Sequence, residues 1–188
     1  MTIQTVLGPM DSSQLGVIAP HEHFFIDTTF EAQTPKDEEA LALFGSKVSI
    51  HNIDVLRRNP FLVKDNMVLE DLDTAVYEVS RFKKAGGDTI VDLTNIGIKR
   101  DLSKIREVSR RTGVNVIAGC GLYTGLTVPE PYASMTDEKL AQWMIREIRD
   151  GWIIVENDKG TEALNAEFVT RVREYPRKKN GKKAAIVD

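Results

Sequence analysis

The chain has 188 residues and nearly balanced charge, with 25 lysines and arginines against 28 aspartates and glutamates. Hydrophobic residues make up 41% and charged residues 28%, as in an ordinary soluble globular domain. This composition excludes a disordered chain, a collagen-like repeat and a strongly cationic nucleic-acid binder. The single cysteine, Cys120, excludes an internal disulfide framework and a multi-cysteine metal cluster. We therefore expect one domain in a reducing compartment, with a cytoplasmic location.

No apolar run reaches the roughly 18 residues that a membrane span needs. Residues 1–5 lack the basic stretch followed by an apolar run that marks a secretory signal. We therefore expect no membrane anchor. Because the formal net charge is -3, we also expect no nucleic-acid partner.

Short apolar runs alternate with longer amphipathic stretches along the chain. Turn-forming residues before position 16 predict a small hairpin, which precedes a first strand that starts in the apolar run 16–20. The mixed segment 27–66 predicts one short helix at 38–44. It also predicts a helix stop at Asn59-Pro60, because proline disfavours the helical conformation of the residue before it. A stretch of this length between stronger elements is usually functional or mobile.

From residue 71 onward the pattern becomes regular. Apolar residues at helical spacing predict three helices, and the third is expected to turn its inner face to the core through Leu140, Trp143, Met144 and Ile148. The first of these helices is predicted to start at Asp71 and to end at 85–87. The second should start near Leu102 and end at Gly113, and the third should start at Thr136. Continuous apolar runs at 88–94 and 114–119 predict buried strands between the helices. This repetition of strand and helix is typical of a parallel α/β architecture.

Two of the three histidines stand together as His21-Glu22-His23, directly after an apolar run. On a strand, residues two apart point to the same face, so both imidazoles are expected on one side and Glu22 on the other. The pair lies towards the carboxyl end of its strand, where parallel α/β folds collect ligands and catalytic groups. Neutral imidazole is a common zinc ligand. Two interpretations stay open: a pair of metal ligands, or a hydrogen-bonded pair on a polar rim.

The stretch around these histidines, VIAPHEH (17–23), resembles the first strand of the phosphotriesterase-like enzymes of the amidohydrolase superfamily. Three further stretches resemble the same family: FKKAGGDTIVD (82–92), GIKRD (97–101) and TGVNVIAGCGLY (112–123). The similarity continues through the predicted helix that ends at Gly151. Most of residues 1–151 is covered by these linked motifs.

This resemblance implies a (β/α)8 TIM barrel with two divalent cations, usually zinc, that activate a hydroxide. The hydroxide attacks a phosphotriester, a lactone or another carboxylic ester, so a small-molecule ester is the implied substrate. His21 and His23 correspond to the two first-strand ligands of the more buried metal. In the family, a carbamylated lysine or a glutamate on the fourth strand bridges the metals. Histidines of the fifth and sixth strands and an aspartate of the eighth complete the site.

The resemblance covers only part of such a barrel. A complete barrel needs roughly 250 residues, whereas the match ends near Gly151, after three to four strand–helix units. No histidine follows His51, so the later histidine ligands of the family are missing from this sequence. We therefore expect a truncated zinc hydrolase whose activity is absent or impaired. The alternative is a non-catalytic fragment or half-barrel that associates with a partner chain or with a second copy.

Other polar and aromatic residues follow the predicted strands. Tyr123 is a candidate substrate-binding residue, although packing explains a lone aromatic equally well. We interpret Asp92 and Asn95 as structural or supporting residues rather than direct ligands. Lys99 stands where family members often have glycine, and His51 is interpreted as a solvated loop residue.

We divide the chain into residues 1–151, the N-terminal part of the barrel, and residues 152–188, a divergent basic tail. The tail carries a basic, turn-rich run at 177–183. Such a patch is compatible with binding to RNA or to an anionic surface, but no aromatic residues are interleaved for base stacking. The overall negative charge favours a solvated terminal segment with a helix at 163–175.

Overall fold

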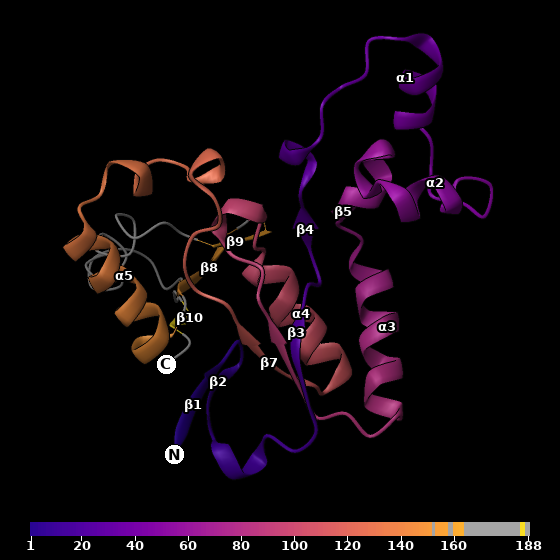
Figure 1. The fold of residues 1–188 in the computed structure, drawn as a ribbon. Coiled ribbons are helices and arrows are strands. Elements are labelled where there is room, and N and C mark those ends of the chain that lie inside the picture. Colours follow the sequence, from indigo (N-terminus) through magenta and orange to yellow (C-terminus); the bar gives the residue numbers. More distant parts are fainter. Residues whose placement is uncertain (152, 158–159, 164–184, 187–188) are drawn as a thin grey trace.

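The structure is a computed structural model that describes residues 1–151, 153–157, 160–163 and 185–186. At its centre lies a parallel sheet with the strand order β3–β6–β7 (Figure 1). Three small antiparallel sheets, β1–β2, β4–β5 and β10–β8–β9, surround it. The strands are β1 (Thr2–Thr5), β2 (Gly8–Asp11), β3 (Ile18–Glu22), β4 (Ile26–Asp27), β5 (Val68–Leu69), β6 (Thr89–Asp92), β7 (Asn115–Ala118), β8 (Ile153–Asn157), β9 (Gly160–Ala163) and β10 (Ala185–Ile186).

Helices connect the parallel strands, with α3 between β3 and β6 and α4 between β6 and β7. The α-helices are α1 (Glu38–Phe44), α2 (Ile53–Arg58), α3 (Leu72–Lys84), α4 (Leu102–Thr112) and α5 (Asp137–Asp150). Short 3-10 turns lie at η1 (Ser12–Gln14), η2 (Thr29–Glu31), η3 (Pro60–Leu62), η4 (Lys64–Met67), η5 (Ile96–Ile98), η6 (Gly125–Thr127) and η7 (Tyr132–Ser134). The predicted alternation of strand and helix is therefore confirmed from residue 71 to residue 150.

The main core lies between the sheet and helices α3 and α4. Ile90 of β6 and Val116 of β7 are paired in register, and both are buried on the side that the helices cover. Val79 of α3 and Ile105 and Val108 of α4 pack against them. A second, smaller cluster forms where Trp143 of α5 meets Tyr132, with ring centroids 4.7 Å apart. The two apolar clusters hold the strand ends in fixed positions, on which a site can be built.

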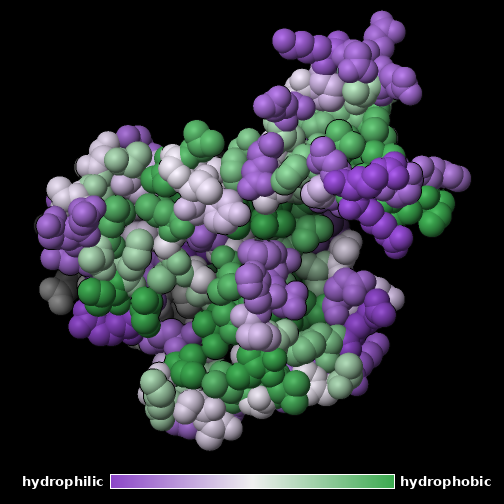
Figure 2. All heavy atoms as spheres, viewed as in Figure 1, coloured by the Kyte–Doolittle hydropathy of each residue, from purple (hydrophilic) through white to green (hydrophobic). Residues whose placement is uncertain are grey.

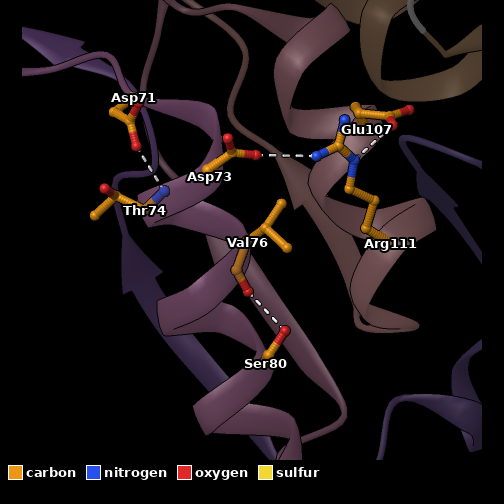
Figure 3. Close-up of polar contacts among 7 residues, drawn as sticks. All are labelled: Asp71, Asp73, Thr74, Val76, Ser80, Glu107 and Arg111. Atoms are coloured by element: carbon orange, nitrogen blue, oxygen red, sulfur yellow. Dashed lines mark hydrogen bonds and ion pairs between the residues drawn. The ribbon is translucent and has the colours of Figure 1, made fainter.

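The helix boundaries follow from local chemistry, as the sequence predicts. Asp71 starts α3, because its carboxylate accepts a hydrogen bond of 2.7 Å from the Thr74 amide. Gly113 ends α4 with φ of 67°, a conformation that favours glycine. The two helices are tied together by Arg111 of α4, whose guanidinium lies 3.1 Å from Asp73 of α3 (Figure 3).

The end of α5 differs from the prediction. Leu140, Trp143 and Met144 contribute to the smaller apolar cluster, but Ile148 is 62% exposed. Its expected place on the inner face is therefore wrong. The reason is geometric, because the cluster around Tyr132 lies opposite the first half of α5 and the last turn extends past it.

The segment between β4 and β5 projects from the body and carries α1 and α2 (Figure 1). Figure 2 shows hydrophilic residues at its tip and hydrophobic ones nearer the body. The helix predicted at 38–44 is confirmed as α1. The predicted helix stop is confirmed too, because α2 ends at Arg58, just before Asn59-Pro60.

The β3 strand forms one edge of the parallel sheet. Among the described residues, β3 pairs with β6 on one side and with no strand on the other. Val17 and Ile18, at the start of this edge, are 59% and 42% exposed. No helix in the described part of the chain is long and apolar enough to cross a membrane. The predicted helix at 163–175 and the basic run at 177–183 lie outside the described residues.

Candidate metal centre

The histidine pair lies at the carboxyl end of β3, and its two rings are neighbours. Their centroids are 5.4 Å apart and their planes are inclined by 74°. Side chains on opposite faces of a strand could not approach so closely, so the two imidazoles share one side. The His21 ring is exposed and that of His23 is half-buried. The structure thus brings together the two residues that the sequence predicts as metal ligands.

The pairing of β3 with β6 is irregular at this point. Ala19 lies opposite Ile90, whereas Glu22 lies opposite Asp92, so three steps along β3 match two steps along β6. The Glu22 carbonyl accepts a hydrogen bond of 2.9 Å from the Leu93 amide. Such bulges re-aim side chains next to functional sites. Here the irregularity sets the direction of His21, near the end of β3, and of His23, directly after it.

Thr94 holds the ring of His23. Its Oγ1 lies 2.9 Å from Nδ1 of His23, and the threonine is fully buried. The buried Asp92 carboxylate fixes both partners, because one oxygen accepts from the Phe24 amide at 2.9 Å and the other accepts from the Thr94 amide at 2.8 Å. Asp92 is therefore a supporting residue, as the sequence predicts. The sequence analysis missed Thr94, although a polar residue directly after a buried strand is a signal that could have indicated it.

The charge state of His23 suits a metal ligand. Burial lowers the pKa of its imidazole below the ordinary value, against an opposing effect of the Asp92 carboxylate, and the neighbouring His21 lowers it further. Burial thus favours the neutral form of the ring. A histidine must be neutral to bind a divalent cation, so burial favours the form of His23 that can bind one.

A groove of about 570 Å³ lies beside this site, between β3 and α3. Its floor is mostly apolar and includes Ala19, Val79 and Phe82. Glu22 and His23 border it at the end of β3. The groove thus runs along the strand edge that has no partner among the described residues and reaches the end of β3.

The pair fits a divalent cation in donor type and arrangement, but it supplies two donors only. Within the part of the chain that the structure describes, no group of three or more histidine, cysteine, aspartate or glutamate side chains could hold a metal ion. Burial raises the pKa of the Cys120 thiol, which disfavours a thiolate ligand there. A catalytic zinc usually has three protein ligands. The two imidazoles can thus form part of a metal site and not a complete one.

The structure also places the other residues that the sequence analysis names. Tyr123 is 48% exposed and its ring meets that of Phe30 edge-on, with centroids 6.0 Å apart. Asn95 follows β6, and its buried Oδ1 has no hydrogen-bond partner among the described residues. His51 is exposed, just before α2, as the sequence predicts. Lys99 has φ of 64°, which explains why glycine is suited to its position.

A largely buried ion pair connects three elements at the carboxyl end of the sheet. Both nitrogens at the end of the Arg100 side chain bind the Glu147 carboxylate of α5, at 2.8 and 2.7 Å. The same guanidinium donates a hydrogen bond of 2.7 Å to the Gly119 carbonyl, directly after β7. Arg100 thereby connects the loop after β6, the end of β7 and α5.

Parallel strand–helix units with polar side chains at the strand ends define part of an α/β fold of the TIM-barrel type. A family model described as the Phosphotriesterase family matches residues 1–160. The chain belongs to the phosphotriesterase family, and the resemblance stated from the sequence is confirmed.

Individual relatives give the same result. The N-acetyltaurine hydrolase of Xenopus tropicalis is 34% identical over 151 residues, which cover 79% of this chain and 43% of that protein. The N-acetyltaurine hydrolase of Tetraodon nigroviridis is 38% identical over 153 residues, with the same shares of 79% and 43%. The crystal structure of a resiniferatoxin-binding protein from Rhodobacter sphaeroides is 39% identical, with a TM-score of 0.74 over 80% of this chain and 42% of that chain. This chain thus spans less than half the length of these relatives.

Proposed function

We propose that this chain contributes the first-strand part of a divalent-metal site in a hydrolase of the phosphotriesterase family. His21 and His23 are the two metal ligands, and zinc is the expected cation. The proposal is carried by one observation, the neighbouring imidazoles at the carboxyl end of β3, in a chain of this family. When bound, a divalent cation lowers the pKa of water and polarises a substrate oxygen, which is the chemistry that ester hydrolysis needs.

The residues of this chain prepare the site for that chemistry. Burial favours the neutral form of His23, and its hydrogen bond to Thr94 fixes the ring. The remaining ligands lie outside the described residues, in more of the same protein or in a partner chain. Two imidazoles alone bind zinc weakly, so the activity depends on those further ligands.

The proposed substrate is a small molecule with a hydrolysable ester bond: a phosphotriester, a lactone or a carboxylic ester. The relatives named N-acetyltaurine hydrolase add an amide of acetic acid to this class. Tyr123 is the proposed substrate contact, because its exposed ring follows the third parallel strand at the carboxyl end of the sheet.

A hydrolysis assay with added zinc tests the proposal. We expect little turnover of an aryl phosphotriester, a lactone, an aryl ester or N-acetyltaurine by this chain alone. Clear turnover by the wild type would contradict the impaired activity. If this turnover were lost in His21→Ala and in His23→Ala but kept in the control His51→Ala, a second copy would be the expected source of the further ligands. Zinc-dependent turnover that survives both substitutions would overturn the metal role of the pair.

A second candidate function is that of a half-barrel that associates with another chain. The exposed edge of β3 favours this candidate, because Val17 and Ile18 expose apolar side chains there and, among the described residues, β3 has no partner strand on that side. A second copy or a partner strand would cover these side chains and the edge of β3. In solution, such association appears as a light-scattering mass above that of one chain.

A further inference from the structure

The network around His23 joins the ends of two strands that are far apart in the sequence. Thr94 is separated from His23 by 71 residues, and both residues belong to one closed arrangement of hydrogen bonds. The Asp92 carboxylate binds the amide of Phe24, the residue after His23, and also the amide of Thr94. The distance between the two side chains is therefore set from the backbone on both sides.

The hydrogen bond occupies one particular ring nitrogen. Thr94 pairs with Nδ1, and among the described residues this is the hydrogen bond that the His23 ring makes. A hydroxyl can donate or accept, so it can accept from a protonated Nδ1. In that tautomer the lone pair is on Nε2, because a neutral imidazole carries one proton. A ring nitrogen that binds a metal is usually set by the hydrogen bond of the other nitrogen.

We infer that Thr94 is the positioning residue of the metal site: its buried hydroxyl accepts from Nδ1 of His23 and leaves Nε2 as the donor atom for a divalent cation. This inference rests on the proposed metal role of His23. Thr94 itself touches neither cation nor substrate. It acts from a fully buried position, through the orientation and tautomer of the imidazole.

The test compares zinc affinities of the purified chain by direct titration with zinc, because two imidazoles alone bind the cation weakly. Thr94→Val keeps the shape of the side chain and removes the hydroxyl, and we expect zinc to bind about 10–100-fold more weakly. Thr94→Ser keeps the hydroxyl and should bind zinc like the wild type. The matched control is Thr89→Val. Thr89, at the start of β6, is as fully buried as Thr94, and its hydroxyl donates to the Leu15 carbonyl at 2.6 Å, away from the histidines.

Nitrogen-15 NMR of the imidazoles gives a readout that loss of stability would not produce. In the zinc-loaded wild type and in Thr94→Ser, we expect His23 to carry its proton on Nδ1. In Thr94→Val the His23 ring signals should change, whereas those of His51 should not, and Thr89→Val should leave both unchanged. Unchanged affinity and unchanged His23 signals in Thr94→Val would overturn the inference and leave the metal role standing. A wild type that binds no zinc would overturn both.

Discussion

At the scale of single residues, Lys99 shows how one side chain can offset an unfavourable backbone conformation. Its φ of 64° is one that glycine adopts freely and lysine rarely does. The Lys99 ammonium, however, forms an ion pair with Asp27 of β4. Glycine could not form this contact, which ties the loop after β6 to the short sheet of β4 and β5.

This ion pair predicts a dependence of stability on pH. Burial raises the pKa of Asp27, but hydrogen bonds from Lys99 and Thr29 outweigh it and bring the pKa to about 2. Because the folded pKa lies below the ordinary 3.8, the stabilisation is complete above that value and disappears as the pH falls through about 2. We expect Asp27→Asn to lower the free energy of unfolding by about 1 kcal/mol near neutral pH, since the exposed Lys99 is screened by solvent.

Urea unfolding of both proteins between neutral pH and about pH 2 measures this difference. The difference in the free energy of unfolding should shrink towards zero as the pH approaches about 2. Asp54→Asn is the control, because Asp54 pairs with Arg58 at 3.1 Å on the exposed surface of α2. A constant difference between wild type and Asp27→Asn over the whole range would contradict the role of the ionised carboxylate.

At the scale of elements, the helices were predictable and the strand register was not. Asp71 and Gly113 carry local signals, so α3 and α4 begin and end where the sequence predicts. The pairing of His23 with Thr94 depends on the irregular register between β3 and β6, which no local pattern encodes. The exposure of Ile148 likewise depends on where the neighbouring cluster ends. Local chemistry therefore predicts the histidine pair, and only the tertiary structure reveals its support.

The ion pair of Arg100 with Glu147 connects three elements and should matter for stability. The side chains are 4% and 13% exposed. Removal of one partner leaves a buried charge uncompensated, so Arg100→Met should lower the free energy of unfolding by about 3 kcal/mol. Urea unfolding measures the change.

Two comparisons make this prediction specific. The double variant Arg100→Met with Glu147→Met should recover part of the loss, because neither charge is then left unpaired. Arg81→Met removes an exposed partner of Glu78, 3.2 Å away on α3, and should cost at most about 1 kcal/mol. If Arg100→Met proved as harmless as Arg81→Met, α5 would not depend on the buried pair.

At the scale of the whole molecule, the chain presents part of a barrel with the histidine pair near one open edge. The parallel strands β3, β6 and β7 follow each other in order, as in the family barrel. The pair lies at the end of β3, next to the edge that has no partner in the described part of the chain.

The account depends on the binding of a divalent cation by His21 and His23. The most direct measurement is the zinc bound per chain at equilibrium, taken together with the light-scattering mass, for the wild type and for the double variant His21→Ala with His23→Ala. We predict that the wild type and the control His51→Ala bind zinc, and that the double variant loses it while keeping the same mass. A double variant that binds zinc as tightly as the wild type would contradict the account.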